Sequence, residues 1–125
     1  MTVAMGNRAH IQVQPHVKER LTQIFVEVLN CDAPTVLNAP GLSEPILAFR
    51  FPDGGSVSFE FSSNAPEEEQ LRRAVWLEVR TDDVHGLSAR VLGAGLERVN
   101  HPATPTFYFV VPGGQVFGIV PARNA

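Results

Sequence analysis

Alternating apolar and polar residues near the N-terminus predict a strand that is followed by a helix. In the segment "RAHIQVQ", Ile11 and Val13 fall on one face and His10 and Gln12 on the other, which is typical of a half-buried strand. Pro15 suits the first turn of a helix. The residues after it place an apolar stripe on one helical face, over about four turns. The stripe consists of Val17, Leu21, Ile24, Phe25, Val28 and Leu29.

The rest of the first half predicts three further strands. A short edge strand is expected at residues 35–38, within a segment rich in proline. Residues 46–51 and 56–61 predict two longer strands, and "PDGG" between them is a strong turn signal. In the second of these strands, Ser58 and Glu60 face away from the apolar side. That apolar side is formed by Val57, Phe59 and Phe61.

The segment "VWLEVRTDDVHGLSARVLGAGLERV" starts the same order of elements again. A strand begins at Val75, and Trp76 and Glu78 lie on its polar side. Asp82 or Asp83 is placed to cap the following helix. The helix ends at Gly93 and Gly95. Its predicted buried stripe consists of Val84, Leu87, Val91 and Leu92. Strands are then expected at residues 96–100, 107–111 and 115–120, the last two forming a hairpin around "PGG".

The repeated order predicts two copies of a strand–helix–strand–strand–strand module. The copies span residues 8–61 and 74–120, and the polar residues 62–73 link them. One copy alone could not cover both faces of its small sheet, so the two copies are expected to pack together. We therefore predict a single α+β domain over residues 1–125. Its two tandem βαβββ modules would form one curved mixed β-sheet, with a cleft inside and the helices on the outer face.

Composition narrows the classes of function. A chain of 125 residues suits one domain, and its net charge of −3 without a basic cluster argues against a nucleic-acid partner. No apolar run is long enough to cross a membrane, and the first residues do not form a signal peptide. Cys31 is the only cysteine, so no intrachain disulfide forms. We expect a cytoplasmic protein.

Four segments of the chain resemble the vicinal oxygen chelate superfamily. They are "HIQV" and "PDGGSVSFEF" in the first copy, and "VWLEVRTDDVHGLSARVLGAGLE" and "PGGQVFGIV" in the second. This superfamily includes glyoxalase I, the bleomycin-resistance proteins and the extradiol dioxygenases. The resemblance covers nearly the whole chain and implies the fold predicted above. It also implies a homodimer, because small members of the superfamily usually pair.

The resemblance also implies where a metal ion would be held in members that use one. Their ligands are His, Gln or Glu side chains from the first and last strands of each copy, which leave open positions for substrate oxygens. His10 and Glu60 stand at the two positions of the first copy. We place Ala74 and Gly118 at the two positions of the second copy, and neither carries a donor. We therefore predict that the chain holds no metal and no cofactor.

Strand alternation instead indicates a set of ligand-binding candidates on the inward face. These are His10, Gln12, Arg50, Glu60, Trp76 and Tyr108, and Ser58 and Glu78 share the same face. A face that mixes aromatic and polar side chains suits a small organic ligand. The hypothesis that Trp76 and Tyr108 instead fill the sheet interior or a dimer interface has equal support.

The other histidines, His16, His85 and His101, are expected at the surface. Cys31 is expected to be a small buried residue rather than a nucleophile.

Two functions from different classes follow. The first is a small-molecule-binding protein of the glyoxalase/bleomycin-resistance type, which sequesters a small aromatic or amphipathic ligand without a metal and without identified catalytic residues. The second is a metal-dependent lyase, isomerase or dioxygenase of the glyoxalase I or extradiol dioxygenase type. Ala74 and Gly118 favour the first. A dimeric domain without a small ligand is a third possibility.

Overall fold

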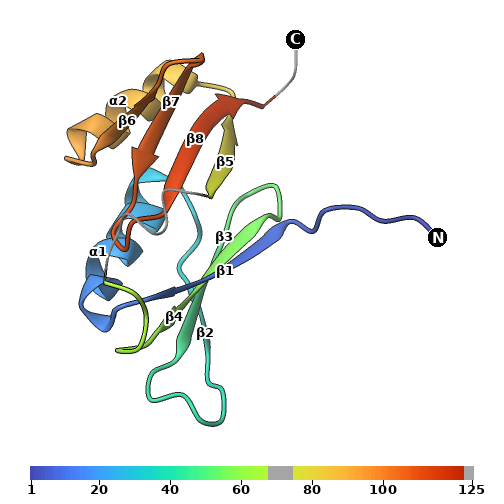
Figure 1. Ribbon diagram of the computed structural model, residues 1–125, viewed down its shortest axis with the longest axis vertical. Coiled ribbons are helices and arrows are strands. Elements are labelled where there is room, and N and C mark those ends of the chain that lie inside the picture. The colour runs from blue at the N-terminus through green and yellow to red at the C-terminus, as the bar shows by residue number, and fades with distance from the viewer. Residues whose placement is uncertain (68–74, 123–125) are drawn as a thin grey trace. The chain divides into compact units, whose positions relative to one another are not determined.

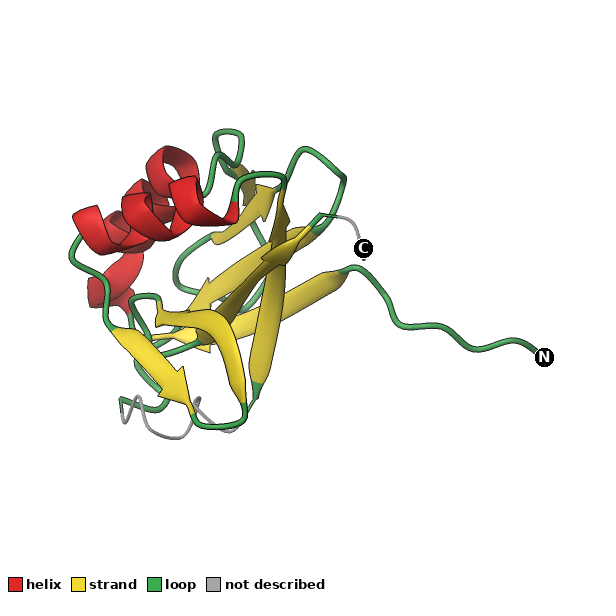
Figure 2. Ribbon diagram, turned by 90° about the horizontal axis from the view of Figure 1, so that it is seen from above, coloured by secondary structure: helices red, strands yellow, loops and turns green. Residues whose placement is uncertain are grey.

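A computed structural model describes residues 1–67 and 75–122 of the chain. The chain divides into two compact units, Met1–Ala65 and Pro66–Ala125. Each unit contains one of the two βαβββ modules, and we call these units the first and the second module. Figure 1 labels their elements, and Figure 2 distinguishes the helices from the strands by colour.

The first module is a four-stranded sheet with one helical segment. Its strands are β1 (Arg8–Val13), β2 (Thr35–Leu37), β3 (Ile46–Arg50) and β4 (Ser56–Phe61), in the spatial order β1-β4-β3-β2. Strands β1 and β4 are parallel, and the other pairs are antiparallel. The helical segment consists of a 3₁₀ turn η1 (Pro15–Val17), α1 (Lys18–Gln23) and a π-helical turn η2 (Ile24–Val28). The predicted helix is thus confirmed, with three kinds of helical turn along its length.

The end of this helical segment positions the main aromatic side chain of the core. The Leu29 N–H donates to the Ile24 carbonyl at 3.0 Å, which gives the wider π-helical turn. The segment stops at Asn30, whose φ of 61° is tolerated better by asparagine than by most residues. Phe25 then packs on the sheet, with its ring centroid 5.1 Å from that of Phe49 and 5.3 Å from that of Phe59. These three rings are fully buried and anchor the helix to one face of the sheet.

The second module repeats this topology. Its elements are β5 (Trp76–Thr81), α2 (Val84–Gly93), β6 (Arg98–His101), β7 (Thr104–Val110) and β8 (Val116–Pro121), and its strand order is β5-β8-β7-β6. Strands β5 and β8 are parallel, and the other pairs are antiparallel. Of the two predicted caps, Asp83 is the one that begins α2: its carboxylate accepts from the Gly86 N–H at 2.9 Å. The helix stops before Gly95, which has a φ of 80°.

The α+β fold with two βαβββ modules is confirmed, and three local expectations are corrected. Leu92, predicted in the buried stripe of α2, is 51% exposed, and Val91 is the one fully buried residue of that helix. Strand β6 starts later and reaches His101, and β7 starts already at Thr104. Ala74 and residues 68–73 of the predicted linker lie outside the described residues. That residues 1–125 form one domain stays a prediction.

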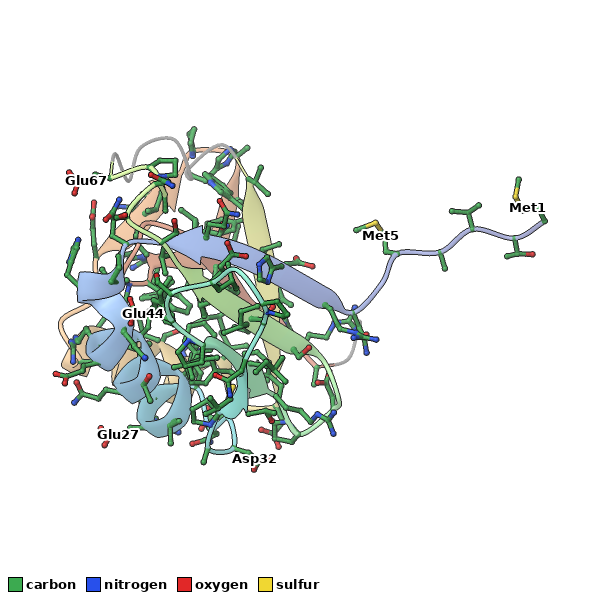
Figure 3. All side chains as sticks on the ribbon, turned by 90° about the horizontal axis from the view of Figure 1, so that it is seen from below. Met1, Met5, Glu27, Asp32, Glu44 and Glu67 are labelled. Atoms are coloured by element: carbon green, nitrogen blue, oxygen red, sulfur yellow. The ribbon has the colours of Figure 1, made fainter. Side chains whose placement is uncertain are left out.

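The N-terminal segment extends away from the first sheet. Met1 and Met5 are fully exposed, and Figure 3 shows both on an extended stretch that leads up to β1. In the part of the chain that the structure describes, none of the helices has the length and apolar character needed to cross a membrane.

Candidate functional site

Strands β1 and β4 place a polar group of side chains on the face of the first sheet that lies opposite its core. Ile11 and Val13 of β1 are buried, as are Val57, Phe59 and Phe61 of β4. Since side chains alternate along a strand, the residues between them point to the other face. His10 pairs directly with Ser58 across the parallel strands, and Gln12 pairs with Glu60. The structure therefore brings together three of the predicted candidates and Ser58, which was predicted on the same face.

His10 lies at the centre of this polar group. Its Nδ1 lies 2.7 Å from the Ser58 hydroxyl, and its Nε2 lies 3.0 Å from one carboxylate oxygen of Glu60. The other carboxylate oxygen of Glu60 accepts from the Gln12 amide at 3.3 Å. His10 remains 45% exposed, whereas Glu60 is only 19% exposed. The carboxylate of Glu60 thus has two neighbouring donors, which offset the cost of its partial desolvation.

Arg50 lies at the margin of this polar group. It is the last residue of β3, it pairs with Ser56, and its side chain is exposed. The three hydrogen bonds that join His10, Ser58, Glu60 and Gln12 do not involve it. Arg50 is therefore a neighbour of the group on the same sheet, and its role in binding stays a prediction.

Three rings from different strands meet on the corresponding face of the second sheet. The ring of Trp76 on β5 lies 4.5 Å, centroid to centroid, from that of Tyr108 on β7. The imidazole of His101 on β6 lies 5.3 Å from the Trp76 ring and 6.5 Å from the Tyr108 ring. All three residues are half-buried. Their neighbours in sequence, such as Phe107 and Phe109, are buried in the core, so the three rings face away from it.

A glycine makes this arrangement possible. Gly118 on β8 pairs with Tyr108 of β7 on one side and with Glu78 of β5 on the other. A Cβ at position 118 would lie 2.7 Å from Cε1 of Tyr108 and 2.9 Å from its Cδ1, closer than such atoms approach. The Tyr108 ring therefore occupies the space above β8 that a side chain would otherwise fill, and it extends toward Trp76.

His101 is the member of this aromatic group that sequence reasoning missed. The segment "HPATP" predicts a loop, and His101 was expected at the surface. Its place on β6 instead gives it the same orientation as Val99, two residues before it, despite an irregularity in the pairing. The Ala103 N–H donates to its Nδ1 at 3.1 Å, so in the neutral ring the proton is on Nε2. Alternation with Val99 was the signal in the sequence that could have identified it.

The strand registers correct the correspondence between the two modules. The Phe51 N–H donates to the Gly55 carbonyl at 2.8 Å, and the Val111 N–H donates to the Gln115 carbonyl at 3.0 Å, so the two hairpin turns are equivalent. The strands that follow then start at Ser56 and at Val116.

Counting from these turns, the pair His10–Ser58 corresponds to Glu78–Gly118. Glu60 corresponds to Val120. The prediction that Ala74 is equivalent to His10, and Gly118 to Glu60, was therefore wrong. It aligned the strands of the two modules out of register. The second module offers one carboxylate, Glu78, at the position equivalent to His10.

Within residues 1–67 and 75–122, no group of three or more His, Cys, Asp or Glu side chains is placed to hold a metal ion. The absence of a metal and of a cofactor stays a prediction. Cys31 is buried, and this burial, with a smaller effect of the Asp32 carboxylate, raises the pKa of its thiol to about 12. Such a thiol is protonated at neutral pH and is a poor nucleophile.

Comparison with known proteins shows what this fold is. No protein-family model matches the chain, and no curated protein sequence matches it significantly. Among solved structures, the antibiotic-binding protein TnmS3 from Streptomyces sp. CB03234 is similar, with 22% identity, a TM-score of 0.65 and coverage of 97% of this chain and 98% of that chain.

Two further structures are similar over most of their length. The fosfomycin resistance protein FosX from Mesorhizobium loti has 18% identity and a TM-score of 0.66, with coverage of 95% of this chain and 91% of that chain. A glyoxalase/bleomycin resistance protein from Streptomyces sp. CB03234 has 24% identity and a TM-score of 0.58, with coverage of 91% and 98%. These proteins are members of the vicinal oxygen chelate superfamily. At such identities the likeness concerns the fold, and the chain has the fold of that superfamily.

Proposed function

We propose that this chain binds a small aromatic or amphipathic molecule, and that it holds the molecule without a metal ion and without changing it chemically. The aromatic group of Trp76, Tyr108 and His101 is the observation that carries this proposal. Aromatic side chains that stay half-buried on the face opposite a core provide flat apolar surface for a ligand. A face that served only to complete the core would be covered by other side chains of its own module.

Two of the similar structures support the same class of function. One is named as an antibiotic-binding protein and the other as a glyoxalase/bleomycin resistance protein. Binding without a metal ion also agrees with the polar group of the first module, where His10 and Gln12 already pair with Glu60. We keep His10, Gln12, Arg50 and Glu60 as proposed polar contacts of a ligand.

The alternative is a metal-dependent lyase, isomerase or dioxygenase, and one observation favours it. Glu78 occupies the position in the second module that His10 occupies in the first, so the second module does supply one oxygen donor. Carboxylate and imidazole donors suit divalent metals. Binding of one metal ion per chain would make this alternative the better account.

A fluorescence titration tests the proposed function. Trp76 is the only tryptophan, so its emission reports on the proposed binding face alone. Purified protein is titrated with naphthalene-2-sulfonate, with acridine and, as a non-aromatic control, with cyclohexane carboxylate. Saturable change of Trp76 emission by an aromatic probe supports the proposal. A linear, unsaturable change with every probe contradicts it.

A further inference from the structure

We propose that Ser58 is a nucleophile, that His10 accepts its proton, and that activated carboxylic esters acylate it. This inference does not depend on ligand binding by the aromatic group of the second module, because the reacting residues all lie in the first module, where His10 and Glu60 are also proposed ligand contacts. It rests on an arrangement in which a hydroxyl, an imidazole and a carboxylate are joined in series by hydrogen bonds. Nucleophilic serines are recognised by this arrangement rather than by their place in the sequence.

The hydrogen bonds fix the direction of proton transfer. Glu60 accepts at 3.0 Å from Nε2 of His10, which places the ring proton on Nε2 and leaves the lone pair on Nδ1. The Ser58 hydroxyl lies 2.7 Å from that Nδ1, whereas its other acceptor, the Ala9 carbonyl, is 3.5 Å away. The hydroxyl proton therefore points to His10. A base atom about 2.6–3.2 Å from the heavy atom that carries the proton satisfies the geometric requirement for general-base catalysis.

The sheet holds the three side chains in place. Ser58 and His10 are paired residues of two neighbouring parallel strands, and Glu60 lies two residues further along the strand of Ser58. Gln12, which pairs with Glu60, donates to its second carboxylate oxygen. Glu60 is thus a positioning residue: it orients the imidazole and stabilises the cation that forms when His10 takes the proton. At 45% exposure, His10 remains accessible to a small ester.

The reaction proceeds in two balanced steps. The Ser58 oxygen attacks the ester carbonyl carbon, and its proton passes to Nδ1 of His10. The bond between that carbon and the leaving alcohol then breaks, and the alcohol takes the proton from His10, which leaves an acyl-serine. Water, deprotonated by His10, attacks the acyl-serine and releases the carboxylic acid and the free hydroxyl. Ester and water are the only reactants.

The position of β4 limits the class of ester. This strand pairs with β1 on one side and with β3 on the other, so the sheet uses its backbone N–H groups. They are not available as a pair of donors for the developing oxyanion, which is a large contribution in fast esterases. We therefore expect acylation by esters with a good leaving group, and slow deacylation. Cys31 does not compete, because its thiol is buried and protonated.

The test is acetylation by p-nitrophenyl acetate in the presence of a chelator, followed by intact mass measurement and peptide mapping. We expect one acetyl group per chain, located on Ser58, and its loss in Ser58→Ala. Ser56→Ala is the matched control, because Ser56 lies on the same face of the same strand and pairs with Arg8 rather than with His10. This control should be acetylated at the rate of the unmodified protein.

Variants of the two partners separate chemistry from folding. His10→Gln should slow acetylation of Ser58 by about 100-fold or more, which is the usual contribution of a general base. Glu60→Ala should slow it as well, and Glu60→Asp should regain part of the rate because it restores a carboxylate. Thermal unfolding shows which variants are folded. Acetyl groups found only on lysines, on the N-terminus or on His10 would overturn the proposal, as would a Ser58→Ala protein that is acetylated as fast as the unmodified one.

Discussion

The ring of Tyr108 lies over Gly118, in the space where a side chain at position 118 would stand. A Cβ there would come within 2.7 Å of the ring, and the same ring lies 4.5 Å from that of Trp76. The missing side chain is therefore what lets the two aromatic residues meet. Gly118 was first considered as a metal-ligand position without a donor, and the structure gives it a different role.

Replacing Gly118 by alanine should displace the Tyr108 ring from Trp76. We expect the free energy of unfolding to fall by about 1–2 kcal/mol, the usual cost of overpacking, and Trp76 emission to change. Urea unfolding followed by circular dichroism measures the first effect. Gly93→Ala, at a helix position with open space around it, is the control and should not destabilise the protein. In a Tyr108→Leu background the cost of Gly118→Ala should largely disappear; an unchanged cost would show that Tyr108 is not its cause.

The fold was predictable because each strand and helix has its own signal in the sequence. The alternation of Ile11 and Val13 with His10, the turn "PDGG" and the Asp83 cap all act locally, and each was confirmed. The correspondence between modules was not predictable, because it depends on the strand registers, and a shift of two residues along a strand keeps every side chain on its face.

The two polar and aromatic groups were predicted in part. Strand alternation identified His10, Gln12 and Glu60 of the first module, and Trp76 and Tyr108 of the second, as residues of the predicted inward face. It could not show that His101 joins the aromatic residues, because "HPATP" favours a loop. Nor could it show that the Ser58 hydroxyl lies 2.7 Å from His10, since this contact depends on the pairing of strands that lie 48 residues apart in sequence.

The thiol of Cys31 should be unreactive in the folded protein and reactive after unfolding. Burial raises its pKa from 9.0 to about 12, so the folded state keeps its proton at pH values where the unfolded state loses it. The resulting stabilisation is complete below pH 9 and is lost as the pH rises through about 12. Between about pH 8 and about pH 10, the free energy of unfolding should fall by about 1 kcal/mol more in the unmodified protein than in Cys31→Ala. Equal slopes of the two proteins would refute this assignment.

The purified protein should bind no divalent metal at one ion per chain. His10 and Gln12 already pair with Glu60, so a cation would have to displace these hydrogen bonds. Elemental analysis after exposure to zinc, nickel, manganese and iron, followed by desalting, measures the content. Stoichiometric binding that is lost in His10→Ala and in Glu78→Ala, but kept in the control His85→Ala, would instead favour the metal-dependent enzyme.

The chain should form a homodimer in solution. Beyond the resemblance that implies it, Val36 and Leu37 on the edge strand β2 are 55% and 45% exposed, and Leu92 on α2 is 51% exposed. Apolar surface of this kind is stabilised by a second copy of the chain. Sedimentation velocity at micromolar concentration should give the mass of two chains. A single species with the mass of one chain would contradict the prediction.

Calorimetric titration with the best aromatic probe tests the central claim, that the face formed by Trp76, Tyr108 and His101 binds a small molecule. We predict saturable binding at one site per chain. Tyr108→Leu should weaken it by about tenfold or more, as expected when a contact worth about 1.4 kcal/mol is lost. His101→Ala should weaken it as well, whereas His85→Ala, an exposed histidine of α2, should bind like the unmodified protein. Equal affinities in all four proteins, or no saturable binding of any aromatic probe, would contradict the account.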